Sequence, residues 1–260
     1  MQFSVRYILL FSAAICGVCA VFVSSLAVGL SERQEINQVL EKKRNVLEAA
    51  GMMKVGEGLS AEEIEKRFSA VRSVVIDLDT GEVQPDIDPE TFDQQKAKKD
   101  PARSTEAPKN AASVFRLPNN ALIYQVLDDS GNIEKLVLPI EGYGLWSTLY
   151  GFIALGSDSR TVEGLTFYQH GETPGLGGEV DNPRWKAHWP GRKAFDENWN
   201  VKLEVIKGAA PPPAEAPYKV DGLSGATITA RGVTNMVRFW LGENGFGPYL
   251  EKYRQERRAA

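Results

Sequence analysis

Residues 121–143 read ALIYQVLDDSGNIEKLVLPIEGY, two runs rich in apolar residues on either side of a short polar segment. That segment, Asp129-Ser130-Gly131-Asn132, has the composition of a tight turn, and each flanking run has the length of a strand. The pattern predicts a β-hairpin. The next residues, 144–170, continue with apolar runs separated by turn residues, so we expect further strands there.

Helical patterns lie on both sides of this strand-rich region. Residues 31–53 have the pattern of an amphipathic helix that ends near Gly51. Ser60 precedes a second helical stretch, and Glu63 completes a capping box with it. Near the C-terminus, Val233, Val237 and Trp240 or Leu241 recur at helical spacing.

The order of these elements predicts an α+β fold. Residues 71–88 favour a strand with Thr80-Gly81 in a turn, and the connections between strands and helices are long. No G-x-G-x-x-G follows a strand, so a Rossmann dinucleotide site is unsupported. With 260 residues, of which 43% are apolar, the chain can form one sizeable domain or two modest ones.

A long apolar segment near the N-terminus predicts a membrane anchor that precedes the soluble part of the chain. Residues 7–30 contain no charged side chain, and as a helix they would span roughly 36 Å, enough to cross a bilayer. A cleaved signal peptide is the alternative, but its apolar region is usually shorter and no convincing cleavage site follows. We expect a short cytoplasmic N-terminus (1–6), a transmembrane helix (7–30), a helical and mixed part (31–113) with a polar loop (89–113), and a main domain (114–260).

Charge alone does not determine the orientation of that anchor. Arg6 lies on one side, and four basic residues follow on the other: Arg33, Lys42, Lys43 and Arg44. This count does not favour a cytoplasmic N-terminus, although long domains translocate largely regardless of charge. Residues 31–260 contain no cysteine, which suits an oxidising compartment.

The net charge, the cysteines and the histidines limit the kinds of ligand and partner that are expected. The net charge is −4 and no basic stripe is present, so nucleic acid is not expected as a partner. Cys16 and Cys19 lie inside the anchor with C-x-x-C spacing, which could supply half of a metal site but is more typical of small residues on one helix face. His170 and His188 are the only histidines, and a structural hydrogen-bonding role is favoured for each.

Residues 221–229, DGLSGATIT, carry the main functional signal. Three hydroxyls lie in a segment of small residues directly before the C-terminal helical pattern. A helix N-terminus offers backbone N–H groups and a field that favours an anion such as phosphate. Thr227 or Thr229 is a candidate N-cap, and Gly225 and Ala226 leave room for a phosphate close to the main chain. An ordinary capped turn remains the alternative.

Four segments in order resemble the C subunit of the sodium-translocating NADH:quinone reductase, a bacterial respiratory pump: GLWSTLYG (144–151), HGETPGLGGEVDNPRW (170–185), VDGLSGAT (220–227) and GFGPYL (245–250). The resemblance includes the S/T-G-A-T flavinylation motif, and it runs through the whole chain. It implies an extracytoplasmic α+β FMN-binding domain behind a single-pass anchor in the bacterial inner membrane, with the C-terminal domain in the periplasm.

The resemblance also implies a cofactor and its contacts. FMN would be esterified through its phosphate to Thr227, delivered from FAD by a flavin transferase. Further contacts to the cofactor would come from Ser224, Gly225, Ala226, Thr229, Trp146, Glu172, Thr173, Leu176, Gly177 and Lys207. Lys207 would place a cation near the phosphate or the reduced flavin. Trp146 lies in an apolar run, so a position in the hydrophobic core is an equal alternative for it.

The implied role is an electron carrier within a multisubunit membrane complex, not an enzyme that is complete alone. The chain would relay single electrons while the complex oxidises NADH, reduces ubiquinone and exports Na⁺. Membrane lipid and the other subunits would be its partners. Three alternatives stay open: a protein like the G subunit of the ion-translocating ferredoxin:NAD oxidoreductase, a membrane-anchored FMN-binding module without turnover, and an extracytoplasmic binding domain without flavin.

Overall fold

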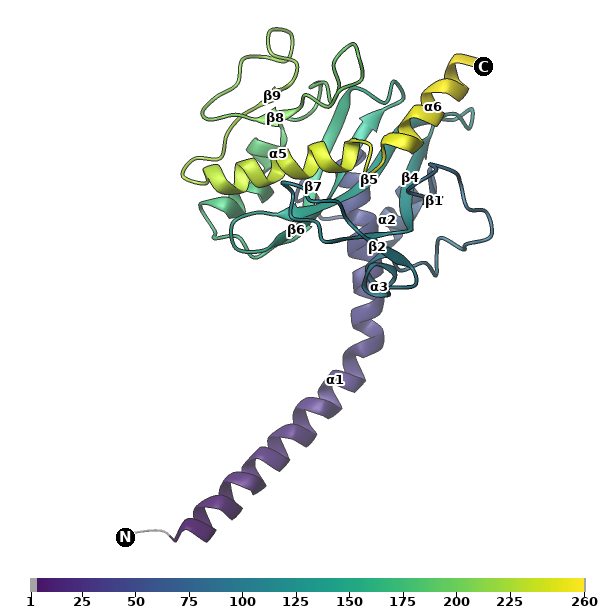
Figure 1. Cartoon of the computed structure of the whole chain (residues 1–260). Coiled ribbons are helices and arrows are strands. Elements are labelled where there is room, and N and C mark those ends of the chain that lie inside the picture. The colour runs from purple at the N-terminus through teal and green to yellow at the C-terminus, as the bar shows by residue number, and fades with distance from the viewer. Residues whose placement is uncertain (1–3, 260) are drawn as a thin grey trace. The chain divides into compact units, whose positions relative to one another are not determined.

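A computed structural model describes residues 4–259 of the chain (Figure 1). These residues divide between two compact units, Met1–Lys42 and Lys43–Ala260. The first unit is the larger part of helix α1 (Val5–Ala49). Within α1, Val5–Ser31 is long and apolar enough to cross a membrane, and it contains the predicted span 7–30.

Helix α1 differs from the expectation of two successive helices. The amphipathic stretch from residue 31 continues the apolar helix without interruption, because no proline separates them. Its end near Gly51 is confirmed. The Gly51 amide donates to the Glu48 carbonyl, the Met52 amide donates to the Leu47 carbonyl, and Gly51 has a φ of 69°. This pair of bonds is a Schellman motif, which needs a left-handed residue.

The centre of the second unit is a five-stranded antiparallel sheet in the order β1-β4-β5-β6-β7. Its strands are β1 (Val71–Asp77), β4 (Asn120–Leu127), β5 (Ile133–Tyr143), β6 (Thr148–Gly156) and β7 (Val162–Gln169). The predicted hairpin is therefore confirmed as β4–β5, with its turn at residues 128–132.

Shorter elements surround this sheet. They are α2 (Ala61–Phe68), α3 (Gln94–Lys99), β2 (Ser104–Glu106), β3 (Arg116–Pro118), the 3₁₀ helix η1 (Gly177–Asp181), α4 (Pro183–Lys186), β8 (Glu204–Val205), β9 (Lys219–Val220), α5 (Thr227–Leu241) and α6 (Gly247–Ala259). The capping box predicted for α2 is present, with Ser60 and Glu63 each accepting from the other's backbone amide.

The segment 89–113 is not the plain loop that its composition suggested. It contains α3, which Asp93 caps, and β2, which pairs with β3. The expected boundary after residue 113 is also absent, because β1 pairs along its whole length with β4. Residues from both sides of that boundary therefore belong to one sheet.

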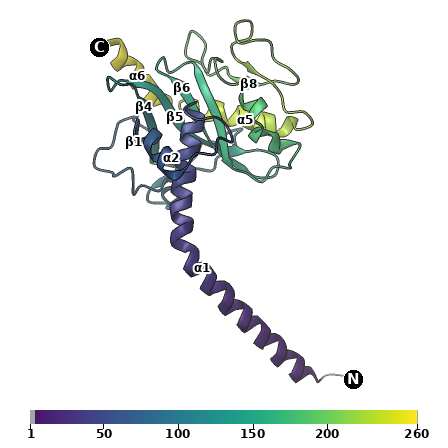
Figure 2. The ribbon, with the colours of Figure 1, turned by 180° about the vertical axis from the view of Figure 1, so that it is seen from behind.

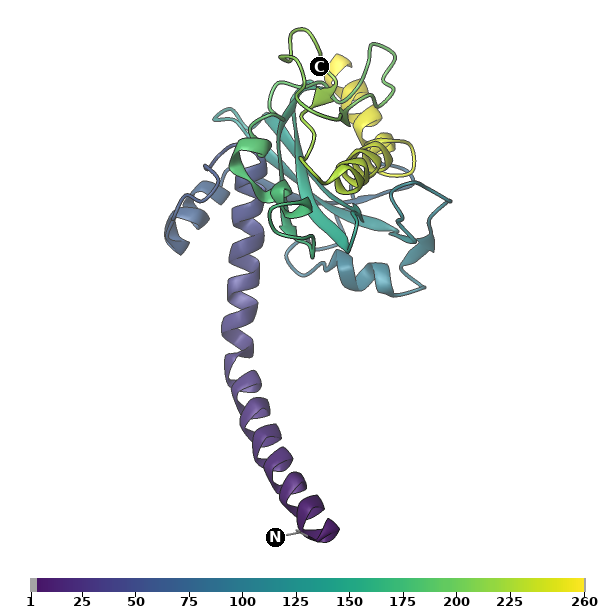
Figure 3. The same cartoon turned by 90° about the vertical axis from the view of Figure 1, so that its left-hand side faces the viewer.

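Helices cover both faces of the sheet. On one face, α5 buries Val233, Met236 and Val237 against strand residues of the main hydrophobic core, and Figure 3 shows α5 lying along that face. Helix α2 lies over the other face (Figure 2). Its Phe68 packs edge-on against Tyr124 of β4. Because both faces are buried, the strands are almost continuously apolar, as observed in β6.

The last turn of α1 packs on the same face of the sheet as α2. Its Glu48 carboxylate accepts from the Thr166 hydroxyl of β7 at 2.6 Å and from the Lys186 ammonium of α4 at 2.7 Å. Both partners are buried, and Lys186 also donates to Thr166 at 2.9 Å. The C-terminal turn of α1 is thereby fixed to the domain.

Candidate functional site

The start of α5 presents the threonine on which the sequence analysis centred. Thr227 is the first residue of the helix and is exposed, and among residues 4–259 its hydroxyl has no hydrogen-bond partner. The expectation that Thr227 or Thr229 is the N-cap is wrong. The helix begins at Thr227, so Ala226 holds that position, and its methyl group cannot cap an amide. Thr229 lies inside the helix, where its hydroxyl donates to a carboxylate.

Backbone geometry explains the small residues around Thr227. Gly225 has a φ of 69°, which side chains rarely adopt, and a Cβ there would lie 3.0 Å from Cδ2 of Leu176. The Ala226 methyl is buried in the core, whereas Ser224 and Gly225 are exposed. The motif therefore turns the chain so that Thr227 faces outward and Ala226 packs inward.

Glu172 connects the start of α5 to two loops. Its Oε2 accepts from the buried Thr229 hydroxyl at 2.6 Å, and its Oε1 accepts from three consecutive backbone amides, those of Leu145, Trp146 and Ser147, at 3.0, 2.9 and 3.2 Å. Gly177 is buried against this contact, since a Cβ there would lie 2.6 Å from both Oε2 of Glu172 and Oγ1 of Thr229.

The same bonds determine the charge state of this carboxylate. Burial alone would raise the pKa of Glu172, but the hydrogen bonds from Thr229 and from the three amides outweigh it and lower the pKa below its ordinary value. Glu172 is therefore an anion, and its carboxylate accepts hydrogen bonds from three backbone amides and one hydroxyl. The structure makes it the residue that positions the 145–147 loop relative to α5.

Beside Thr227 lies a cavity of about 670 Å³ between α5 and the chain that follows β8. Its lining includes Ser224, Gly225 and Thr227, together with Lys207 from the chain that follows β8. The parallel pairing of β8 with β9 brings these two segments together. The contact is tight, because a Cβ on Gly222 would lie 2.3 Å from the Ile206 carbonyl oxygen.

The cations of this cavity differ in how they are paired. Arg238 forms an ion pair with Glu204 at 2.8 Å. Lys207 and Arg231 also line the cavity, and no carboxylate in the described part of the chain lies within ion-pair distance of either. The cavity therefore has two cations available to neutralise a bound anion.

Exposed apolar side chains lie on Ile228, which follows Thr227, and on the two loops that Glu172 connects to α5. Trp146 is 65% exposed, Leu176 is 45% exposed and Ile228 is 53% exposed. The core alternative for Trp146 is therefore excluded. Its backbone is nevertheless fixed, because its amide donates to Glu172 and its carbonyl accepts from the Tyr143 hydroxyl at 3.1 Å. Thr173 lies in the same exposed turn as Leu176, where its carbonyl accepts from the Leu176 and Gly178 amides.

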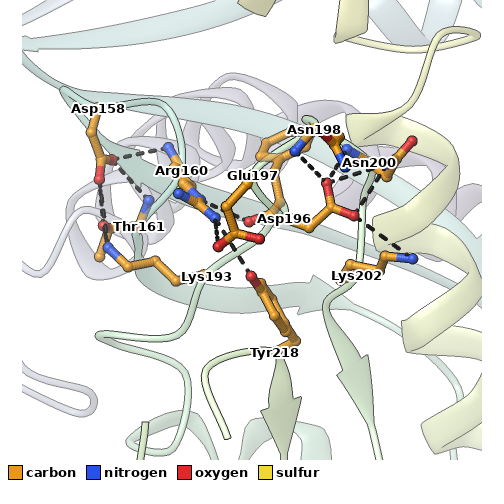
Figure 4. Close-up of polar contacts among 11 residues, drawn as sticks. Asp158, Arg160, Thr161, Lys193, Asp196, Glu197, Asn198, Asn200, Lys202 and Tyr218 are labelled. Atoms are coloured by element: carbon orange, nitrogen blue, oxygen red, sulfur yellow. Dashed lines mark hydrogen bonds and ion pairs between the residues drawn. The ribbon is translucent and has the colours of Figure 1, made fainter. Parts of the chain in front are cut away.

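A polar network connects the loop between β6 and β7 to the chain before β8 and to the residue before β9 (Figure 4). Arg160 donates to Glu197 at 3.0 Å, to the Tyr218 hydroxyl at 3.5 Å and to the Phe195 carbonyl at 2.8 Å. Tyr218 directly precedes β9, which leads into residues 221–227. The loop between β6 and β7 thereby fixes the chain that enters the threonine segment.

His170 makes structural hydrogen bonds through both ring nitrogens, as expected, whereas the ring of His188 has only a longer contact to a carboxylate. Nδ1 of His170 accepts from the Glu172 amide at 3.2 Å, so Nε2 carries the proton that is shared with Asp181 at 2.7 Å. His188 lies 3.6 Å from Asp221. Cys16 and Cys19 are exposed on α1, and the described residues contain no group of three or more potential metal ligands.

Among the cations of the cavity that lack an ion-pair partner in the described residues, sequence reasoning missed Arg231. Arg231 lies four positions after Thr227 on α5, a spacing that places two side chains on the same helix face. That spacing was available from the sequence once the helix start was known. The roles of Gly222 and of the Glu172 hydrogen bonds needed the tertiary contacts.

Comparisons with known proteins agree with this geometry. Residues 144–242 match the family model of the FMN-binding domain. The chain is 45% identical over 259 residues to the C subunit of the Na⁺-translocating NADH-quinone reductase of Pseudomonas aeruginosa, covering 98% of both chains, and 44% identical to that of Yersinia pestis, covering 97% of this chain and 94% of the relative. This chain belongs to the C-subunit family of that reductase.

Solved structures from this family share the fold. The crystal structure of Shewanella oneidensis NqrC matches with a TM-score of 0.76 at 36% identity, covering 83% of this chain and 97% of the other. The C subunit from Parabacteroides distasonis matches with a TM-score of 0.62 at 26% identity, covering 85% and 96%. The α+β fold behind one apolar helix is therefore confirmed, as is the family resemblance seen in the sequence.

The residues of this cavity suit FMN. The FMN-binding domain match spans the 145–147 loop, the 172–177 loop, Lys207 and α5. Within it, a hydroxyl and two cations that have no partner among the described residues line one cavity. Leu176, which is exposed, lies against Gly225 at the edge of that lining. A phosphate needs the hydroxyl and the cations, and an isoalloxazine ring needs the apolar surface.

Proposed function

We propose that this chain is the covalently flavinylated electron-carrier subunit of a Na⁺-pumping NADH:ubiquinone reductase. The observation that carries the proposal is the exposed Thr227 hydroxyl, unbonded within residues 4–259, at the edge of a cationic cavity inside a matched FMN-binding domain. When bound, FMN supplies one-electron redox chemistry. The chain's own residues hold and orient it.

The attachment step assigns a specific role to Thr227. Its hydroxyl oxygen forms a bond to the FMN phosphorus of FAD, the phosphoanhydride bond to AMP breaks, AMP leaves and the hydroxyl proton is released. A flavin transferase catalyses this exchange in our proposal. The product is a phosphodiester, so the tethered cofactor cannot dissociate and rebinding becomes intramolecular.

The residues that line the cavity and those of the neighbouring loops have distinct proposed duties. Lys207 neutralises charge at the phosphate or the reduced ring, and Ser224 and Gly225 line the phosphate end. Trp146, Thr173 and Leu176 offer an exposed surface to the ring. Glu172, Gly177 and Thr229 act behind them, because their contacts fix the 145–147 loop against α5.

The cellular setting completes the proposal. The α1 segment Val5–Ser31 anchors the chain in the bacterial inner membrane, with the flavin domain in the periplasm. The other subunits of the reductase are its partners. Copurification with them, together with electron delivery from NADH to the attached flavin, would separate this role from that of an isolated flavin-binding module.

A threonine substitution tests the attachment. Thr227→Ala removes the attacking hydroxyl from an exposed position, so we expect complete loss of covalent flavin with the fold retained. Protein from a host that contains the transferase is denatured, and flavin fluorescence on the gel and intact mass are measured. Thr227→Ser and Ser224→Ala are the controls, since each leaves a hydroxyl at 227.

One result would move the attachment elsewhere. If Thr227→Ala kept full fluorescence, Ser224 would become the first candidate, because it lines the same cavity and is exposed. Thr229 is buried, and its hydroxyl is committed to Glu172. Absence of flavin from the unsubstituted protein would refute the electron-carrier proposal itself.

A further inference from the structure

We propose that Arg231 is a positioning residue that binds the phosphodiester at Thr227. The proposal rests on the proposed function, since it concerns the same cofactor. It adds a second cation to the site, on the helix that carries the attachment point. Arg231 and Lys207 would then hold the phosphate from two sides.

Helix geometry places Arg231 next to the attachment point. Thr227 and Arg231 are one helical turn apart on α5, and both line the same cavity. Side chains at this spacing are neighbours on the helix surface, with Cβ atoms about 5–6 Å apart. The long arginine side chain can span the distance to an oxygen bonded to Thr227.

The surroundings of the Arg231 guanidinium also support a role in binding the phosphate. Among residues 4–259, no hydrogen bond or ion pair engages its guanidinium, although it lines a cavity with two carboxylates. Those carboxylates have other partners: Glu204 pairs with Arg238 at 2.8 Å, and Asp221 accepts from the Ala210 amide at 3.1 Å. The charge of Arg231 is thus left available for a ligand.

The chemistry of the ligand matches this arrangement. A phosphodiester keeps one negative charge and two unesterified oxygens, and a guanidinium can donate to both in parallel. Lys207 is a point charge on a flexible stem, so it supplies charge with less orientation. Arg231 would therefore fix the direction in which the tethered flavin leaves the helix.

Two substitutions and a charge-matched control test the idea. Arg231→Gln removes the cation, and Arg231→Lys keeps the charge without the forked donors. Arg258→Gln removes one exposed arginine from α6, outside the cavity, and so changes the net charge equally. The ³¹P resonance of the attached phosphate is recorded for each flavinylated full-length protein. The rate of flavin incorporation is also measured with FAD and the transferase, and thermal melting reports the fold.

We expect Arg231→Gln to shift the ³¹P resonance and to slow incorporation by about fivefold, the scale of one exposed charge-assisted contact. Arg231→Lys should restore part of both, and Arg258→Gln should match the unsubstituted protein. An unshifted resonance in Arg231→Gln, or equal shifts in Arg231→Gln and Arg258→Gln, would overturn the role of Arg231. Absence of flavin from the unsubstituted protein would refute the proposed function instead.

Discussion

Glu172 is the residue on which the geometry of the site most depends. One buried carboxylate accepts from three amides and one hydroxyl, so removing it leaves four donors without an acceptor. We expect Glu172→Ala to lower the free energy of unfolding by about 3 kcal/mol and Glu172→Gln by about 1 kcal/mol, because the glutamine oxygen still faces the amides. Urea denaturation measures both, and Glu215→Ala, on an exposed loop, is the control. Equal losses for the alanine and glutamine variants would contradict the hydrogen-bond explanation.

The lowered pKa of Glu172 gives a separate prediction about acid stability. A carboxylate with a folded-state pKa below its unfolded value of about 4.3 contributes stability that is fully present above that value and is lost as the pH falls through the folded-state pKa. The unfolding free energy of the unsubstituted protein should therefore fall more steeply than that of Glu172→Gln below about pH 4.3. Denaturant melts between neutral pH and about pH 3 test this. A parallel decline in the two proteins would show that Glu172 does not titrate as proposed.

At the scale of elements, the buried contact among Glu48, Lys186 and Thr166 joins α1, α4 and β7. Lys186→Met leaves the Glu48 carboxylate buried without its cation, so we expect a loss of about 3 kcal/mol in unfolding free energy. Glu48→Gln alone strands the ammonium in the same way. The double variant removes both charges and should lose less than the sum of the single losses. Urea denaturation of the four proteins measures the coupling, and strict additivity would mean that the pair contributes no interaction energy.

The elements also show how far the sequence could predict the fold. Hydrophobic periodicity located the β4–β5 hairpin and α5, and local side-chain chemistry located the α2 cap. Helix α3 and strand β2, with six and three residues, are too short for periodicity to detect. In the site, the motif and the family resemblance pointed to Thr227 and Lys207. The Thr229 hydroxyl points inward to Glu172, and Glu172 positions the 145–147 loop. Both depend on contacts between residues more than 20 positions apart in sequence, which a local pattern cannot reveal.

For the whole molecule, the structure predicts where the soluble domain begins. The compact unit starts at Lys43, and Val46, Leu47 and Ala49 at the end of α1 are fully buried in it. Deleting residues 1–42 should therefore release a soluble domain that still accepts flavin. Deleting residues 1–50 should not, although it removes only eight further residues.

The energetics of α1 explain the difference between these two deletions. Each fully buried aliphatic side chain stabilises a fold by about 1.5–3 kcal/mol, and losing Val46 and Leu47 together with the Glu48 contact approaches the roughly 5–15 kcal/mol that separates folded from unfolded domains. Gel filtration, urea denaturation and gel fluorescence after exposure to the transferase compare the two deletions. Equal stability and equal flavin content would show that the last turn of α1 belongs to the anchor alone. A folded, flavinylated 43–260 domain beside an unstable 51–260 domain would place the structural boundary inside one continuous helix.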